Sequence, residues 1–416
     1  MTSPSTSSPS TSPQPPLLTR EFLLLVLGHF LQALGFSSML LLPLYLEHLG
    51  ADRGEIGSLM ALAALGGLLS RPLAGWALDR YGRKPTVLCG TLLLVTSMAL
   101  LSRVESLGWL ILVDRLLLGV ATGTLFTGYF TWASDLIPAQ RRTEGIALFG
   151  VSGLLPIGLN AFVGSMNLPP ERLPTLFLAL GALIALSLLA VLPLPETLAP
   201  EERASQGEGG VALRSLLARR LAPVWLATSI FAGLVGLFFA FATVTAKARG
   251  IPSPPSLWLS YSLGAVGVRL LGGRLPDQVG PHNLVAPALG LYVLALLVCA
   301  RGETREAFLL AGLLGGLAHG YCFPVLVGQV VERSPARYRG SAMAAFTALW
   351  QASELVLPPP AGRFADAHSD AAMYLLAAGA AVAGLAAWAA LEGRFGAEAS
   401  SLASPAAAPS LAGGPK

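Results

Sequence analysis

The sequence predicts an all-α integral membrane protein with twelve transmembrane helices, arranged as two pseudo-symmetric bundles of six. Three observations support this fold class: the chain is strongly apolar, it contains twelve apolar runs of membrane-spanning length, and its two halves carry the same residues in register. Of the 416 residues, 54% are hydrophobic and 12% are charged, and the mean hydropathy is +0.65. Soluble domains carry about 25% charged residues, so this composition places the chain in a membrane.

The same composition excludes several classes of function. A soluble multidomain enzyme needs a charged surface and a disordered protein needs low hydrophobicity, so neither fits. The three cysteines are isolated in apolar runs, which indicates neither a disulfide framework nor a metal site. We find no sign of nucleic-acid binding, of a catalytic triad or of an ATP-binding loop, and we expect no enzymatic activity and no cofactor.

The predicted spans are apolar runs bounded by charged residues or by Pro and Gly. They are 21–47, 55–78, 85–102, 108–134, 142–165, 172–193, 221–246, 256–276, 283–300, 305–331, 340–361 and 371–391. A polar connection at 194–220 separates a first bundle at 20–193 from a second at 221–393. The leader at 1–19 and the tail at 394–416 are rich in small polar residues, Ala and Pro, so both are predicted to be disordered.

The distribution of Lys and Arg predicts the orientation in the membrane. With both termini placed in the cytoplasm, the inner loops receive about twice as many basic residues as the outer loops, as the positive-inside rule requires. Only Arg71, Arg115 and Arg269 fall inside spans. We therefore expect a monomeric, multi-pass protein of the cell inner (plasma) membrane with both termini in the cytoplasm.

The two halves repeat the same residues at a nearly constant spacing. Arg71, Gly75, Asp79 and Gly82 recur 198 positions later as Arg269, Gly273, Asp277 and Gly280. At a spacing of 197, Gly119 and Gly123 recur as Gly316 and Gly320. Because six crossings return the chain to its starting side, a tandem duplication predicts two parallel repeats related by an axis along the membrane normal.

Several motifs resemble those of the major facilitator superfamily. Residues 75–84 read G-W-A-L-D-R-Y-G-R-K and resemble the family's signature between helices two and three, G-x-L-x-D-R-x-G-R-K. Arg115 with Gly119 and Gly123 resembles the family's fourth-helix pattern, and residues 138–144 (P-A-Q-R-R-T-E) resemble its next loop. The resemblance extends over nearly the whole chain apart from the tails, and it implies a secondary transporter.

The loop motif is predicted to act as a gate. An aspartate at a helix end can pair with arginine or face the N-terminus of a neighbouring helix, and a glycine permits the tight turn. The resemblance implies that this latch closes the inner side; the alternative is that the basic residues only orient the protein. The predicted gating residues are Gly75, Asp79, Arg80, Gly82, Arg83, Lys84, Gly273, Asp277 and Gly280.

Glu354 is the main candidate for proton coupling, because function should concentrate where the repeat is broken. Its counterpart 197 positions earlier is Ile157, and a carboxylate near the middle of the membrane can take up and release a proton during transport. The alternative is a permanent ion pair with an arginine such as Arg115 or Arg269.

Four other residues are candidates for proton coupling: Asp114, Arg115, His29 and His319. Adjacent helix residues point about 100° apart, so we expect Arg115 to pair with another helix or with substrate rather than with Asp114. The alternative for Arg115 is a structural ion pair at the outer helix end. Either histidine could instead only hydrogen-bond a neighbouring helix.

Polar and aromatic side chains inside the spans are candidates for contacts in the substrate cavity. They are Gln32, Arg71, Tyr129, Trp132, Asn160, Arg269, Gln329, Trp350 and Gln351. The duplication of Arg71 and Arg269 favours a structural role for these two residues, such as ion pairing or snorkelling to the inner surface, and contact with substrate is the alternative.

The leading functional hypothesis is proton-coupled efflux of small amphiphilic or metabolite-like molecules by alternating access. A proton-driven importer of a sugar, organic acid or siderophore-like solute is the alternative, in which the three buried arginines bind an anion. A non-transporting membrane receptor or scaffold is the alternative from another class. We expect the partners to be a small-molecule substrate, protons and the lipid bilayer.

Overall fold

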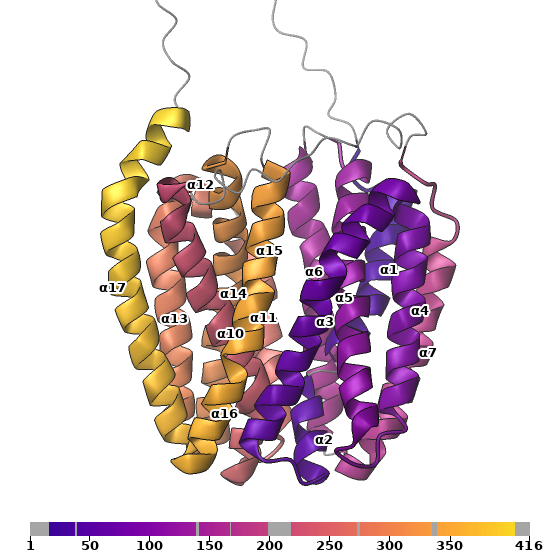
Figure 1. Cartoon of the computed structure of the whole chain (residues 1–416), viewed down its shortest axis with the longest axis vertical. Helices are drawn as coiled ribbons and strands as arrows, with labels where there is room; N and C mark the ends of the chain where they lie inside the picture. Colours follow the sequence, from indigo (N-terminus) through magenta and orange to yellow (C-terminus); the bar gives the residue numbers. More distant parts are fainter. Residues whose placement is uncertain are drawn as a thin grey trace, which may run out of the picture.

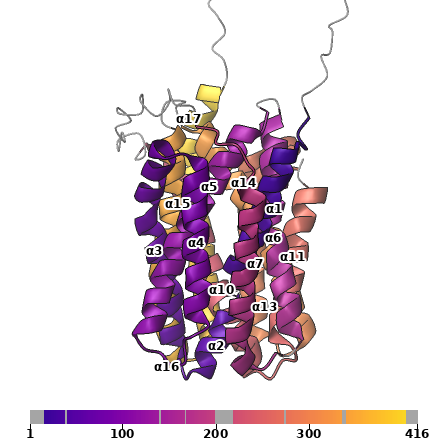
Figure 2. The same cartoon turned by 90° about the vertical axis from the view of Figure 1, so that its right-hand side faces the viewer.

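The computed structural model describes residues 16–37, 40–138, 141–166, 168–198, 218–272, 275–334 and 339–403. Within these ranges the regular elements are helices, and most run roughly along the long axis of the molecule (Figure 1). Helices from the beginning of the chain gather on one side and helices from its end on the other. The first helix begins and the last helix ends at the same end of the molecule (Figures 1 and 2).

Among the residues that the structure describes, the first half contains seven α-helices. They are α1 (Arg20–Ser37), α2 (Leu42–His48), α3 (Arg53–Arg80), α4 (Arg83–Leu101), α5 (Trp109–Leu136), α6 (Arg142–Ser165) and α7 (Leu173–Val191), with a 3-10 turn η3 (Pro170–Arg172) before α7. Asp52 starts α3 with a capping box: its side chain accepts from the Glu55 backbone N–H, and the Glu55 carboxylate accepts from that of Asp52.

The second half begins with a 3-10 turn η4 (Arg219–Leu221). Its helices are α10 (Ala222–Ala248), α11 (Leu257–Leu271), α12 (Leu275–Val279), α13 (Pro281–Arg301), α14 (Arg305–Glu332), α15 (Arg339–Val356), α16 (Pro358–Ala367) and α17 (Asp370–Ala403), with η5 (Pro254–Ser256) before α11. Eight helices of the described chain are long and apolar enough to cross a membrane, judged by length and composition.

Three of the predicted spans cover more than one α-helix, and one of them, 256–276, covers α11 and the start of α12. The range 21–47 falls on α1 and α2, and the range 340–361 falls on α15 and α16. The break between α15 and α16 has a clear cause, since three consecutive prolines at 358–360 lack the backbone N–H that a continuous helix needs. The exact number of spans therefore stays a prediction, while the all-helical membrane fold is confirmed.

The predicted disordered tail at 394–416 is wrong in its first part. Helix α17 continues to Ala403, through an Ala- and Glu-containing stretch that favours helix. The remainder of the tail from 404, most of the leader and residues 199–217 of the connection lie outside the described residues.

The predicted repeat is confirmed by how helices cross in each half. In the first half, a methyl group on Gly119 of α5 would overlap the Ala63 carbonyl of α3. In the second half, a methyl group on Gly316 of α14 would overlap the Tyr261 carbonyl of α11. Residues 63 and 261 differ by 198 and residues 119 and 316 by 197, so the two crossings are equivalent, and each requires a glycine for backbone contact.

Candidate functional site

A cavity of about 90 Å³ lies between the two halves. Its lining comes from the end of α1 and the residues after it, from α3, α5 and α6 on one side, and from α10, α15 and the start of α16 on the other. The lining residues are Ser37, Leu40, Met60, Ala63, Ala64, Leu118, Thr122, Ile157, Gly236, Phe239, Gln351, Glu354 and Pro358. The cavity is thus lined by both Glu354 and its repeat counterpart Ile157. The sequence comparison finds the repeat broken at this pair of positions.

Glu354 lies in the last turn of α15, shortly before the proline-induced break. Its Oε1 atom accepts a hydrogen bond of 2.8 Å from the Trp350 indole nitrogen one helical turn earlier. Among the described residues, no Lys, Arg or His nitrogen lies within 4.0 Å of its carboxylate. The expected alternative of a permanent ion pair with Arg115 or Arg269 is therefore absent from this part of the structure.

Arg71 connects the two halves beside Glu354. Its Nε atom donates a 2.7 Å hydrogen bond from α3 to the Gln351 Oε1 atom of α15. The guanidinium also lies 5.6 Å from the centre of the Phe126 ring, a cation–π contact. Gly67 leaves room for the Gln351 amide, which a larger side chain would displace. The structure therefore brings four of the predicted site residues together: Arg71, Trp350, Gln351 and Glu354.

His319 lies in an aromatic cluster on the second-half side of the interface. Its Nδ1 atom is 2.5 Å from the Tyr261 hydroxyl. Its ring lies 5.3 Å from that of Phe231 and 6.0 Å from that of Trp350, centre to centre. His319 is therefore connected to Glu354 through the Trp350 side chain.

His29 lies apart from this cluster, inside the first half. Its Nδ1 atom is 2.7 Å from the Ser152 hydroxyl of α6, and its ring packs 4.4 Å from that of Phe149. This geometry matches the alternative role stated for it, a hydrogen bond between neighbouring helices.

The expectation for Arg115 is wrong. Its Nη2 atom lies 2.8 Å from the Asp114 Oδ2 atom and its Nε atom 3.2 Å, and both side chains are almost fully buried. Ser97 of α4 donates a 2.7 Å hydrogen bond to the other oxygen of Asp114 and holds the carboxylate in place. The long arginine side chain can bend across the angle between adjacent positions, so sequence neighbours can neutralise each other. Neither residue lines the cavity.

Tyr129 and Trp132 were predicted as cavity contacts, but both are fully buried in the core of the first half. Tyr129 fills the space next to Gly28 of α1, where a larger residue would collide with its hydroxyl. Gln32 is buried on α1 and Gln329 is buried on α14. None of these four lines the cavity, and the side chain of Asn160 lies outside the described residues.

The loop motif forms a compact turn between α3 and α4. Gly82 has a φ of +108°, a conformation that favours glycine, and Glu196 occupies the space where a side chain would stand. The Glu196 carboxylate accepts hydrogen bonds of 3.0 Å from the backbone N–H groups of Arg83 and Lys84, which caps α4. Arg83 also donates a 2.9 Å hydrogen bond to Asp135 of α5.

Other parts of the predicted gate stay predictions. Asp79 interacts electrostatically with Arg83, Arg80 is exposed near the end of α3, and Gly75 is half-buried. Gly280 has a φ of +86° and precedes α13 as Gly82 precedes α4, so the second copy retains the turn. Gly273 and the side chain of Asp277 lie outside the described residues.

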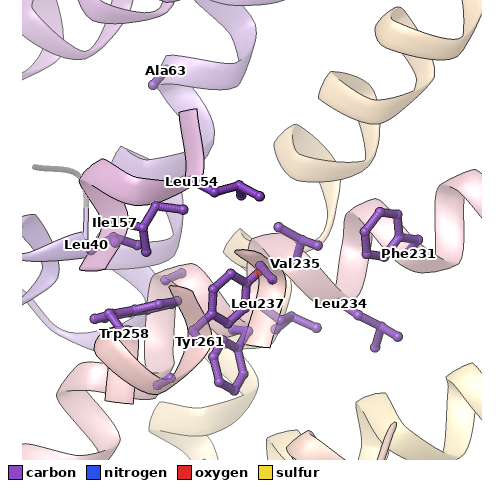
Figure 3. Packing of buried hydrophobic residues seen from close by; sticks show 14 of the residues in the cluster. Leu40, Ala63, Leu154, Ile157, Phe231, Leu234, Val235, Leu237, Trp258 and Tyr261 are labelled. Carbon is purple, nitrogen blue, oxygen red and sulfur yellow. The ribbon is translucent and has the colours of Figure 1, made fainter. Parts of the chain in front are cut away.

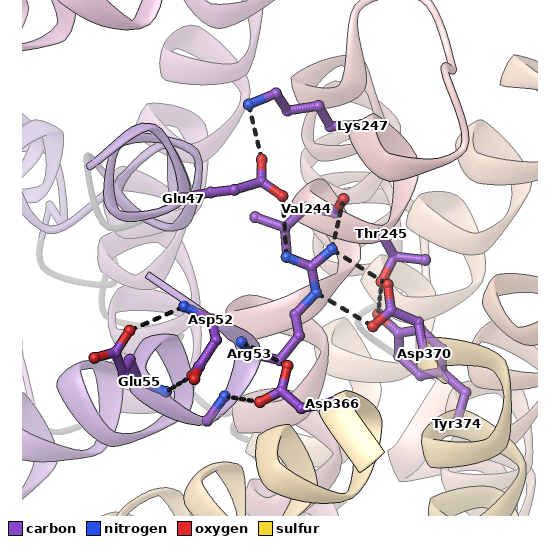
Figure 4. A network of polar contacts seen from close by, with 11 residues as sticks. Glu47, Asp52, Arg53, Glu55, Val244, Thr245, Lys247, Asp366, Asp370 and Tyr374 are labelled. Atoms are coloured by element: carbon purple, nitrogen blue, oxygen red, sulfur yellow. Dashed lines mark hydrogen bonds and ion pairs between the residues drawn. The ribbon is translucent and has the colours of Figure 1, made fainter. Parts of the chain in front are cut away.

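A polar network that the sequence analysis missed joins the halves at the opposite end of α3 (Figure 4). Arg53 contacts Glu47 of the same half at 3.0 Å and Asp370 of the other half at 3.2 Å. Asp366 accepts from the backbone N–H groups of Arg53 and Gly54, and Lys247 lies 2.7 Å from Glu47. In sequence, these charges looked like ordinary loop residues at helix ends.

The fold and the cavity define a class of protein: a multi-pass membrane transporter built from two repeated helical halves. The sequence profile of the Major Facilitator Superfamily matches residues 25–358 and 256–412. The chain belongs to this superfamily.

Curated relatives and solved structures agree with the family. An uncharacterised MFS-type transporter of Burkholderia mallei (strain SAVP1) is 28% identical over 350 residues, covering 82% of this chain and 84% of that protein. The MFS-type transporter YhhS of Escherichia coli (strain K12) is 25% identical over 348 residues, covering 80% and 82%. A crystal structure of a mutant of the peptide transporter POT with sulfate shares the fold, with a TM-score of 0.77 and 16% identity, over 93% of this chain and 98% of that one.

Proposed function

We propose that this transporter is a secondary active, proton-coupled exporter of small amphiphilic molecules that works by alternating access. The observation that carries the proposal is the position of Glu354, a carboxylate in the cavity between the halves with a Trp350 hydrogen bond and no counter-ion within 4.0 Å among the described residues. The protein would act as a monomer in the inner membrane, with both termini in the cytoplasm.

The energetics of burial support a proton-carrying role for Glu354. An ionised carboxylate without a partner costs several kcal/mol in the membrane interior, so the neutral form is favoured where the cavity is closed. Where the cavity opens to water, the same group can release its proton. Alternation between these two states couples proton movement to movement of the halves.

The two ends of the interface support alternating access. At the Arg53 end, contacts with Asp370 and Asp366 cross between the halves and hold that end together. At the Asp79 end, the described contacts of Arg83 and Glu196 stay within the first half. The described contacts thus join the two halves at the Arg53 end and stay within one half at the Asp79 end. This arrangement fits a state that is closed on the Arg53 side. The predicted orientation makes this the outer side.

Glu354→Gln tests the proposal, because glutamine has nearly the same volume and mimics the protonated acid. We expect the variant in proteoliposomes to lose substrate accumulation driven by a pH gradient while it retains exchange of substrate without a gradient. The matched control is Glu332→Gln, which removes an exposed carboxylate at the end of α14. Wild-type accumulation by Glu354→Gln would show that this carboxylate is structural.

The same vesicles separate export from import. An exporter that exchanges substrate for protons accumulates substrate in vesicles with an acidic lumen, whereas an importer that carries both together accumulates it when the outside is acidic. Accumulation only with the outside acidic would overturn the export direction and favour the importer.

A further inference from the structure

The two arginines at equivalent positions of the repeat have different surroundings. Arg71 donates from Nε to Gln351, whereas the Nε atom of Arg269 is buried without a hydrogen-bond acceptor. Among the described residues, no carboxylate lies within 4.0 Å of Arg269. A buried charge without a partner raises the free energy of the folded protein. Arginine stays charged in proteins, so Arg269 cannot avoid this cost by losing its proton.

The repeat explains why Arg269 lacks an acceptor. The residue equivalent to Gln351, 197 positions earlier, is Leu154 of α6, which is buried and apolar. Gly150, one turn before Leu154, makes room for the Arg269 guanidinium, because a side chain there would overlap its Nη1 atom. Arg269 thus reaches from α11 across to α6 of the other half, as Arg71 reaches to α15, but among the side chains that the structure describes its Nε atom finds no acceptor there.

Arg269 and the cavity both contact α6, at positions two turns apart. Gly150 touches the guanidinium and Ile157 lines the cavity, and seven residues of α-helix span about 10 Å. Leu154 and Ile157 face α10 and α11 across the interface, where Tyr261 and Val235 lie opposite (Figure 3). The distance of about 10 Å along α6 from Gly150 to Ile157 is the length of a small organic molecule.

The residues at and near the cavity differ between the halves. Tyr261 and His319 in the second half correspond to Ala63 and Thr122 in the first, and both of these small residues line the cavity. Trp350 corresponds to Gly153. The cavity is therefore lined by small side chains where the equivalent positions of the second half carry aromatic rings, and small side chains leave room in the cavity for an apolar body.

We propose that the substrate is an organic anion: its carboxylate binds Arg269, and its apolar or aromatic body extends toward the cavity beside Glu354. The inference deepens the proposed function, because it names the class of amphiphilic molecule that the exporter carries. A bound carboxylate supplies the acceptor that Leu154 does not, and arginine suits a carboxylate because its planar fork matches the two oxygens.

The test compares 2-naphthoate with its neutral relative 2-naphthamide, using purified full-length protein in lipid nanodiscs and isothermal titration calorimetry. We expect wild type to bind the carboxylate at least tenfold more tightly than the amide. Arg269→Gln should abolish this preference and leave the affinity for the amide within about twofold. The matched control is Arg301→Gln, which removes an exposed arginine at the end of α13 and should preserve the preference.

A second variant tests the role of the missing acceptor without removing the arginine. Leu154→Gln restores in the first half the amide that Gln351 supplies in the second, so it should satisfy Arg269 internally and reduce the preference severalfold. A wild-type protein that does not bind the carboxylate, or binds both probes equally, overturns the proposal. So does a preference that survives in both Arg269→Gln and Leu154→Gln.

This measurement is independent of proton coupling, because no gradient is imposed. If Glu354→Gln keeps gradient-driven accumulation while wild type prefers the carboxylate, the proposed coupling fails and the anion site stands. If Glu354→Gln loses accumulation while wild type shows no preference, the anion site fails and the coupling stands.

Discussion

The two halves of the molecule share a backbone plan and differ in the side chains that they present to each other. Gly119 and Gly316 occupy equivalent helix crossings and meet equivalent carbonyl groups. At the interface, Ile157 faces the same cavity as its counterpart Glu354, and Leu154 stands where the other half has Gln351. The comparison teaches that the duplication preserves glycines at the helix crossings, while several residues that differ between the halves line the cavity.

The largest expected effect concerns a feature that only one half contains. The buried pair of Asp114 and Arg115 corresponds to Ala311 and Gly312, so the second half folds without it. Asp114→Asn removes the carboxylate charge that pairs with the buried Arg115 guanidinium and should destabilise the protein by about 3–5 kcal/mol. Thermal unfolding of the detergent-solubilised protein, followed by size-exclusion chromatography, measures the loss.

A double variant, Asp114→Asn with Arg115→Gln, sharpens this prediction. Because it removes both charges, it should be more stable than Asp114→Asn alone. A double variant as unstable as the single one would mean that the pair contributes shape and hydrogen bonds rather than charge balance.

A moderate effect is expected at the shared crossings. Gly119→Ala and Gly316→Ala each force a methyl group against a backbone carbonyl, which should cost about 1–3 kcal/mol in both halves alike. Gly328→Ala is the matched control, since Gly328 lies on α14 with no atom within 4 Å of an added methyl group, and alanine should be neutral or slightly stabilising there. A melting temperature lowered by only one of the two variants would break the equivalence of the halves.

The smallest effect is expected at the turn before α4. Burial raises the pKa of the Glu196 carboxyl, but the backbone N–H groups of Leu198, Arg83 and Lys84 that donate to it outweigh this effect, so its pKa is lowered. The turn before α13 contains Gly280 but is packed by His282 and Asn283 in place of a carboxylate. The stability of the first turn should therefore depend on pH through this carboxylate.

A lowered pKa in the folded state means that Glu196 stabilises the fold above its ordinary pKa of 4.5 and loses this effect as the pH falls through the lower, folded value. Glu196→Gln should lower the melting temperature slightly at pH 7, and the difference from wild type should shrink below pH 4.5. Asn283→Ala in the second turn is the comparison. A difference that stays constant with pH would show that the carboxylate charge contributes nothing.

Much of the fold could be predicted from the sequence because its causes are local or periodic. The apolar runs identify membrane helices whatever their neighbours are, and the duplicated glycines identify the repeat and its register. Glu354 could be selected because a comparison of the two repeats needs only the alignment of residues. The same comparison of Ala63 with Tyr261, and of Thr122 with His319, would have identified two more residues of the cavity lining, Ala63 and Thr122.

Only the tertiary structure decided which side chains meet. It paired Arg115 with its own neighbour, buried Tyr129 and Trp132 in the first half, and joined Arg53 to Asp370 across the interface. It also left the Arg269 Nε atom without an acceptor. The physical reason is that spacing along a helix sets the direction of a side chain only relative to that helix. The rotation and crossing of neighbouring helices, together with the reach of flexible side chains, decide what that direction contacts.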